Sequence, residues 1–322
     1  MDCMEAMIVR FTLLALAVYL AMGFSPPTQG EMLQAIGSIE GLSYTFRRAL
    51  DPGSDFDPIP LPNPGDWLAE HYEEGQTYND FVKTGKNKPD ALRNTIYLQP
   101  LGEFPEDRSP SLKALKACAS ASFTMPVKIL PPLNIDRVQF TTRINPYTGN
   151  RQVLTRDVLV VLVGRLPADA YCLLAITMVD LYPDPSWNFV FGQASLLKRV
   201  GVFSFARYDP AFYGDKRQKG YRKLLLRRSC KVLIHETAHM FSLRHCIFFS
   251  CMMNGSNHLQ ESDARPMFFC PVCLRKIHHS VGFDVVDRYR RLLLFYEQIG
   301  FTDEAGWLRK RLKRITGNDN GK

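Results

Sequence analysis

The chain has 322 residues, a formal net charge of +8 and a hydrophobic content of 46%, which is the balance of an ordinary globular protein. Its length is sufficient to bury a core, and the basic excess indicates a solvated basic face more readily than an anionic partner. Eight cysteines in a chain of this length exclude a small disulfide scaffold and favour a reducing compartment.

The first segment, residues 1–30, contains an uncharged and mostly apolar run at residues 11–22. This run is too short for a transmembrane helix, so we expect no stable membrane span, but it has the length of a signal-peptide core. Small residues at Ala21 and Gly23 favour cleavage, whereas two acidic residues near the start argue against it. The cysteines favour a cytoplasmic or nuclear location. The alternative is secretion, with residues 1–23 as a signal peptide.

Residues 31–94 are predicted to be an extension that precedes the main domain. Apolar positions at helical spacing predict a short helix over residues 31–50. Residues 51–66 carry five prolines, which predict an extended linker without regular structure, anchored to the body by Trp67. Residues 73–94 are polar, and we expect an exposed loop there.

From residue 95 to residue 322 the pattern changes to that of one α/β domain followed by C-terminal helices. Residues 155–166 are ambiguous, because their apolar run suits a buried strand while Thr155 suits the N-cap of a helix. The other expected strands cover residues 96–98, 127–130, 171–181 and 201–208, and the other expected helices cover residues 111–123, 221–241, 281–298 and 303–315.

Three histidines and a glutamate lie close together near the end of the expected helix 221–241. His235 and His239 are four residues apart, so a helix places them on one face, where they can bind one Zn²⁺ ion. His245 completes the three-ligand set of a catalytic zinc site if the chain reverses after the helix. Glu236 projects about 100° round the helix from His235, where it can take a proton from metal-bound water. The alternative is an amphipathic core helix with incidental histidines.

Four cysteines follow directly. Cys246, Cys251, Cys270 and Cys273 have the spacing of a tetrahedral thiolate site that holds a structural zinc ion. Together with the histidine site, this predicts two zinc ions per chain, one catalytic and one structural. Two disulfide bonds are the competing interpretation. In the zinc interpretation, His245 and Cys246 are neighbours that bind different metal ions.

The combined pattern, HExxHxxxxxHC-x4-C-x-M…CxxC, resembles that of the archaemetzincins, a family of small zinc peptidases. Residues 180–195, 201–208 and 255–261 also resemble the animal archaemetzincin-2 type. The resemblance implies an α/β (α+β) metzincin-like fold with a mixed twisted sheet, an active-site helix and a small zinc-stabilised helical C-terminal part. It further implies a helix at residues 155–166, a substrate-binding strand at 201–208, and Met253 beneath the catalytic zinc.

The sequence departs from the metzincin pattern at Ser242, where glycine is expected. The chain reverses there, and a left-handed conformation costs serine on the order of 1 kcal/mol. The leading hypothesis is a zinc metallopeptidase in which Glu236 activates zinc-bound water to hydrolyse a peptide or protein substrate. The alternative is a zinc-stabilised binding protein with little or no catalytic activity. Nucleic-acid binding through the basic run at residues 309–314 is not expected.

Overall fold

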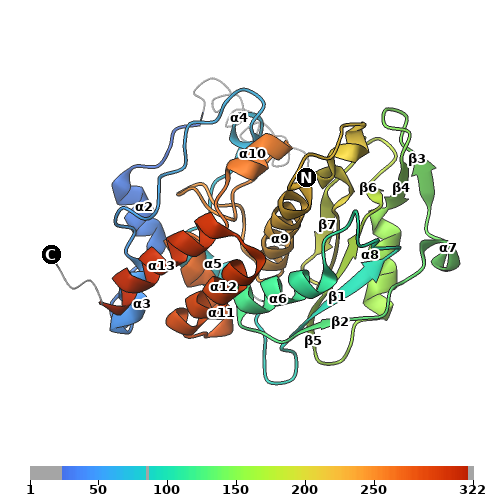
Figure 1. Ribbon diagram of the computed structural model, residues 1–322. Coiled ribbons are helices and arrows are strands. Elements are labelled where there is room, and N and C mark those ends of the chain that lie inside the picture. The colour runs from blue at the N-terminus through green and yellow to red at the C-terminus, as the bar shows by residue number, and fades with distance from the viewer. Residues whose placement is uncertain (1–23, 85–86, 318–322) are drawn as a thin grey trace, which may run out of the picture.

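The computed structural model describes residues 24–84 and 87–317 (Figure 1). The apolar run at residues 11–22 and the expected cleavage site lie outside these residues. Among the helices that are described, none is long and apolar enough to cross a membrane.

A five-stranded sheet with the strand order β2-β1-β5-β8-β7 forms the centre of the molecule. All neighbouring strands are parallel except β7, which pairs antiparallel with β8 at the edge. A second sheet has the order β3-β4-β6. The strands are β1 (Thr95–Leu101), β2 (Val127–Ile129), β3 (Thr142–Ile144), β4 (Arg151–Leu154), β5 (Ala170–Thr177), β6 (Asp180–Tyr182), β7 (Gly192–Ser195) and β8 (Val200–Ser204).

Helices cover both faces of the main sheet, which is why β5 is buried throughout. Successive side chains of a strand point to opposite faces, so Leu173 and Leu174 belong to different hydrophobic clusters. Helix α8 (Thr155–Gly164) packs on the Leu173 face. Helices α6 (Leu112–Phe123) and α9 (Tyr221–Met240) pack on the Leu174 face, and Figure 1 shows α9 between the sheet and the C-terminal helices.

Two expectations about this part of the chain need correction. Residues 155–166 form a helix, as expected, but Thr155 is its first residue and not its N-cap, because the hydroxyl of Thr155 bonds Gln193. The expected strand at 201–208 ends at Ser204 and continues into a 3₁₀ helix (Ala206–Tyr208). Since β8 is paired on both sides, the free edge at this end of the sheet belongs to β7.

The N-terminal extension contains more regular structure than predicted. The expected helix at 31–50 is two helices, α2 (Gln29–Ile36) and α3 (Tyr44–Leu50), because Gly37 ends the first with a φ of 78°. The expected loop at 73–94 contains α5 (Tyr78–Thr84), whose Phe81 side chain is buried in the core. A short helix α4 (Trp67–Glu70) follows the proline-rich segment. A boundary at residue 94 stays a prediction.

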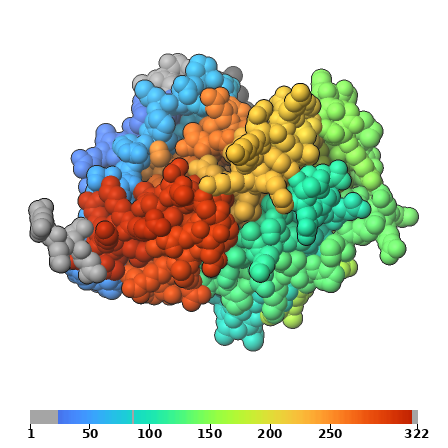
Figure 2. Space-filling model, in the orientation of Figure 1, coloured from blue at the N-terminus to red at the C-terminus, as the bar shows by residue number. Residues whose placement is uncertain are grey.

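The C-terminal helices pack against this extension, and Figure 2 shows the two ends of the described chain side by side on one face. The expected helix at 281–298 begins at Val285, since Gly282 ends the preceding helix and Asp284 caps the next. Gly300 ends that helix in a left-handed conformation. The remaining helices are α7 (Ile135–Val138), α10 (Leu259–Ala264), α11 (Pro271–Val281), α12 (Val285–Ile299), α13 (Thr302–Thr316) and the 3₁₀ helix Pro210–Tyr213.

Candidate metal centre

The last turns of α9 position the first two histidines. Its buried face is anchored by Leu225, Cys230 and Leu233, which lie in the main hydrophobic cluster. The helix ends at Met240, and Ser242 then has a φ of 67°. This left-handed residue confirms the reversal that the sequence predicts, and it returns the chain toward the face from which His235 and His239 project.

The three histidines form one compact group. One ring nitrogen from each of His235, His239 and His245 lies within 4.8 Å of the other two. The Nε2 atoms of His235 and His239 are 3.0 Å apart. Two nitrogen ligands of a tetrahedral zinc ion lie about 3.4 Å apart, so the observed spacing is compatible with zinc.

The second nitrogen of each ring is already hydrogen-bonded. Nδ1 of His235 lies 3.0 Å from the carbonyl oxygen of Met252, and Nδ1 of His239 lies 2.6 Å from that of Leu243. Nδ1 of His245 lies 2.7 Å from Oε1 of Glu73. Because a carbonyl or carboxylate only accepts, each Nδ1 donates its proton and each Nε2 keeps a lone pair for a metal ion.

Burial keeps two of these rings neutral. It lowers the pKa of His239 to about 4 and holds the pKa of His235 well below its usual range, and neighbouring imidazoles act in the same direction. A neutral imidazole is the form that binds a metal ion. The residues therefore fit zinc in spacing, tautomer and charge.

Glu236 lies beside this group but is not part of it. Its side chain borders a cavity of about 270 Å³, together with His235 and His245. The opposite walls are residues 190–192, at the start of edge strand β7, and α10. Burial raises the pKa of Glu236 to about 7, and the charge of Arg265 acts in the opposite direction. A carboxyl group of this kind exchanges protons readily near neutral pH.

The four predicted cysteines also come together. One sulfur from each of them lies within 4.8 Å of the others, and Sγ of Cys246 lies 3.6 Å from Sγ of Cys270. Sulfur ligands of a tetrahedral zinc ion lie about 3.8 Å apart, whereas a disulfide bond is about 2.05 Å long. All four thiols are unbonded and buried. Cys118, Cys172 and Cys230 are also buried free thiols, and they pack as small hydrophobic side chains.

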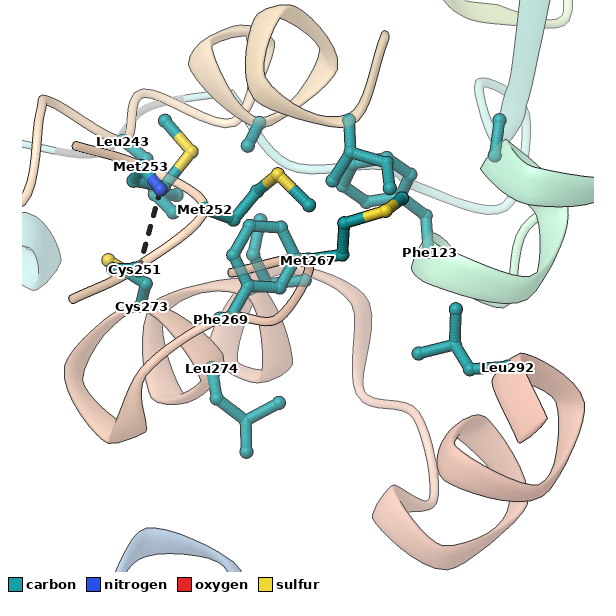
Figure 3. Close-up of a cluster of buried hydrophobic side chains, with 14 of the residues drawn as sticks. Phe123, Leu243, Cys251, Met252, Met253, Met267, Phe269, Cys273, Leu274 and Leu292 are labelled. Carbon is teal, nitrogen blue, oxygen red and sulfur yellow. Dashed lines mark hydrogen bonds between the residues drawn. The ribbon is translucent and has the colours of Figure 1, made fainter. Parts of the chain in front are cut away.

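A short loop connects the two groups. Figure 3 shows Met252, Met253 and Cys251 in this loop among buried hydrophobic side chains. The backbone N–H of Met253 donates to Sγ of Cys251, and the two atoms are 3.4 Å apart. The carbonyl of Met253 accepts a bond from the N–H of Cys246 at 2.8 Å, and Met253 is fully buried. Since the carbonyl of Met252 orients His235, the cysteine group and the histidine group share one rigid segment.

Sequence analysis missed the contribution of the N-terminal extension to this site. Nε2 of Gln76 donates to the carbonyl of Ser242 at 3.2 Å, and Oε1 of Gln76 accepts from the N–H of Arg244 at 3.1 Å. Glu73 orients His245, and the indole of Trp67 donates to the same carboxylate oxygen at 2.9 Å. No local pattern indicates the contacts of Gln76 and Glu73 with residues 242–245, because these partners are more than 160 residues apart in the chain.

Comparison with known proteins identifies the family of the chain. The model of peptidase family M54 matches residues 128–279. Archaemetzincin-2 of Homo sapiens is 40% identical over 281 residues, which cover 79% of this chain and 78% of that protein. The chain belongs to the archaemetzincin family. It is a zinc metallopeptidase, and so a hydrolase, of mixed α/β fold.

Other archaemetzincins are more distant. Archaemetzincin-1 of Mus musculus is 33% identical over 256 residues, which cover 70% of this chain and 51% of that protein. The crystal structure of archaemetzincin from Methanopyrus kandleri is 26% identical, with a TM-score of 0.45, and covers 61% of this chain and 99% of that chain.

A third group of possible ligands in this archaemetzincin is a hydrogen-bond network. It consists of Asp66, His258 and Glu261. Nδ1 of His258 accepts from the N–H of Glu261 at 3.2 Å, and Nε2 lies 3.0 Å from Asp66. The Glu261 carboxylate accepts from the N–H groups of Trp67 and Asn257. Both nitrogens of the imidazole are therefore engaged, and the network ties the extension to α10.

Proposed function

We propose that His235, His239 and His245 hold the zinc ion of this peptidase and that Glu236 is its general base and acid. One observation carries the proposal. Each of the three Nδ1 atoms has an acceptor, so the three Nε2 lone pairs remain for one metal ion, and Glu236 borders the cavity beside them. This donor set is typical of catalytic zinc, which keeps one position for solvent or substrate.

Zinc at this position would lower the pKa of water and polarise the carbonyl group of the peptide bond. Glu236 then takes one proton as the water oxygen bonds to the carbonyl carbon. The same carboxyl group returns that proton to the peptide nitrogen as the carbon–nitrogen bond breaks, which leaves a carboxylic acid and an amine. The position of Glu236 at the cavity beside His235 and His245 suits it to both steps.

The substrate class follows from the walls of the cavity. Residues 190–192 border the cavity next to the edge strand β7, which has a backbone edge that β8 does not use. An extended peptide can pair with such an edge through main-chain hydrogen bonds, independently of its sequence. We therefore assign substrate binding to the β7 edge, and the substrate is a peptide or an extended segment of a protein.

We further propose that Cys246, Cys251, Cys270 and Cys273 hold a second, structural zinc ion. The free and buried state of the four thiols and the short Cys246–Cys270 sulfur distance support this assignment. A closed thiolate site contributes folding free energy directly, because its ligands do not converge in the unfolded chain. The count is then two zinc ions per chain.

The decisive variant is Glu236→Gln, which preserves the shape of the side chain but cannot take up the proton. Zinc content and thermal stability should stay near those of the wild type. Peptide hydrolysis should fall by roughly 10²–10⁴-fold, the usual effect of removing a positioned acid–base group. Glu106→Gln, on an exposed loop, is the matched control.

The second candidate function is a zinc-stabilised binding protein with little catalysis, which the strained Ser242 motivates. It predicts almost no hydrolysis by the wild type and unchanged partner binding in Glu236→Gln. If the wild type is active and Glu236→Gln cleaves peptides equally well, the proposed role of Glu236 is wrong.

A further inference from the structure

Arg265 has an unused pair of hydrogen-bond donors next to the catalytic cavity. The residue directly follows α10 and borders the same cavity as His235 and Glu236. Its Nε and Nη2 atoms are buried, and neither has a hydrogen-bond partner among the described residues. Buried guanidinium donors without partners are costly, because they have lost water and gained nothing in exchange.

Nε and Nη2 form the side-on fork of a guanidinium group. Two parallel N–H donors on this edge match the two oxygens of a carboxylate. Elsewhere in this chain the same edge does bind a carboxylate: Nε and Nη2 of Arg207 each donate to Asp180 at 2.8 Å. The fork of Arg265 can bind a carboxylate in the same way.

The acidic side chains nearest to Arg265 are bonded to other groups. The carboxylate of Asp263 accepts hydrogen bonds from Nε and Nη2 of Arg228. The carboxylate of Glu261 accepts hydrogen bonds from two backbone N–H groups. Glu236 interacts with Arg265 through its charge, without a hydrogen bond between them. The positive charge of Arg265 is therefore not neutralised by a direct ion pair within the described residues.

Lys231 also borders this cavity, but its ammonium group is already hydrogen-bonded within the protein. Its ammonium group donates to the carbonyls of Ser262 and Asp263, at 2.6 and 3.1 Å. These bonds hold the end of α10 against α9 and so fix the position from which Arg265 extends. Burial also lowers the pKa of Lys231 to about 7. Arg265 keeps its charge at neutral pH, because burial lowers its pKa only to about 10.

Arg265 also borders a second, larger cavity of about 770 Å³ beneath the proline-rich segment. In the catalytic cavity it shares the lining with His235, Glu236 and Tyr208. That cavity, at about 270 Å³, has room for a side chain or chain end rather than for a large ligand.

We propose that Arg265 binds a carboxylate of the substrate, on the residue that directly follows the cleaved bond. This assignment rests on the proposed peptidase site. Binding requires the guanidinium to turn its fork toward the cavity, because Nε and Nη2 are buried. The carboxylate belongs either to an aspartate or glutamate side chain or to the free C-terminus of the substrate. The first source makes the enzyme an endopeptidase selective for acidic residues, and the second makes it a carboxypeptidase.

Four matched peptides distinguish these sources. Two carry glutamate or glutamine after the cleaved bond within a longer amidated peptide. The other two peptides end at the residue after the cleaved bond, which is glutamine. Their C-terminus is a free carboxylate in one peptide and an amide in the other. For the wild type, kcat/KM should be on the order of 10- to 100-fold higher for one carboxylate peptide than for its uncharged match, as expected for a charge-assisted hydrogen-bonded pair.

Arg265→Met keeps the aliphatic part of the side chain and removes the charge. This variant should lose the preference, so that it cleaves each carboxylate peptide and its uncharged match with equal kcat/KM, and it should keep its zinc. Arg265→Lys should retain part of the preference, because it keeps the charge without the fork. Arg156→Met, at an exposed position on α8, is the matched control and should change nothing.

A uniform loss of activity on all four peptides would overturn the proposal, since it would place Arg265 at the reacting carbonyl or in the fold. Equal cleavage of charged and uncharged peptides by the wild type would overturn it as well. Calorimetry with the dipeptides Glu-Ala and Gln-Ala tests binding without catalysis. If neither peptide series is cleaved but the wild type binds Glu-Ala more tightly than Gln-Ala and Arg265→Met does not, the peptidase assignment fails and the carboxylate site stands.

Discussion

The carboxylate of Glu73 and the imidazole of His245 are 2.7 Å apart, although 172 positions separate them in the chain. The other two histidines are oriented by backbone carbonyls, which the fold holds in place. His245 instead follows a left-handed turn, and a side chain from the N-terminal extension orients it. Burial raises the pKa of Glu73, but the hydrogen bond from His245 outweighs this effect and keeps it below its ordinary value. The extension is thus part of the candidate metal centre.

Removing this contact should weaken zinc binding. Glu73→Ala leaves Nδ1 of His245 without its acceptor, and the loss of such a partner typically lowers metal affinity by about 10–100-fold. Glu73→Gln should have a smaller effect, because its amide oxygen still accepts the proton. Competition with a chelator measures both affinities. Glu74→Ala, at the exposed neighbouring position, is the control. Unchanged zinc affinity in Glu73→Ala would mean that His245 is oriented by other contacts.

Ser242→Gly should stabilise the protein. At a φ of 67°, glycine avoids a steric cost of roughly 1 kcal/mol that serine carries. The hydrogen bond from Gln76 goes to the backbone carbonyl of Ser242, so the substitution preserves it. We expect a higher free energy of unfolding in urea, with zinc affinity and turnover kept or improved. Ser242→Ala should show no such gain, because alanine has the same steric cost. A loss of zinc from Ser242→Gly would contradict this account of the turn.

The sequence predicted which histidines and which cysteines come together, because their spacing is local. A helix places positions four apart on one face, so His235 and His239 are evident without a structure. The left-handed turn at Ser242 could likewise be predicted, since His245 reaches the same face only if the chain reverses. Cysteine spacing predicted the second group in the same way.

Contacts between distant segments could not be predicted. Glu73 and Gln76 lie in a polar stretch, and nothing in their immediate neighbours indicates burial. The sequence did not predict helix α5, because its burial depends largely on Phe81. A single buried position gives no periodic pattern. The edge position of β7 depends on which strands pair, and residues 192–195 contain no run of β-branched residues to mark a strand. In the sequence, nothing distinguishes Arg265 from a solvent-exposed arginine, because the burial of its donors depends on distant neighbours.

Separate substitutions should distinguish the two proposed zinc sites. His239→Ala should lose one zinc ion and leave a folded protein, because α9 is held by its buried apolar face. Cys270→Ser should lose the other and loosen the C-terminal helices, since the four cysteines are fully buried among them. Native mass spectrometry counts the ions, and hydrogen exchange locates the loosened region. A wild-type protein with one zinc ion and two disulfide bonds would contradict the two-site proposal.

The last prediction concerns Asp55, a buried anion in the segment predicted to be a linker. Its carboxylate lies 2.7 Å from Nη1 of Arg311 and 3.0 Å from Nη1 of Arg314, both on α13. Asp55→Asn leaves the fully buried Arg311 without its countercharge, so unfolding should become easier by about 3–5 kcal/mol at pH 7. Asp57→Asn, at an exposed position two residues later, is the control and should change the free energy of unfolding little.

The difference between Asp55→Asn and the wild type should depend on pH. Burial raises the pKa of Asp55, but hydrogen bonds from Arg311 and Arg314 outweigh it and hold the pKa below its ordinary value. A carboxyl group with a lowered folded-state pKa stabilises the fold above its unfolded pKa of about 3.9. That contribution disappears as the pH falls through the lower folded-state pKa. The urea midpoints of wild type and variant should therefore lie far apart at pH 7 and converge below about pH 4. A constant separation across this range would show that the ionisation of Asp55 is not what ties the proline-rich segment to α13.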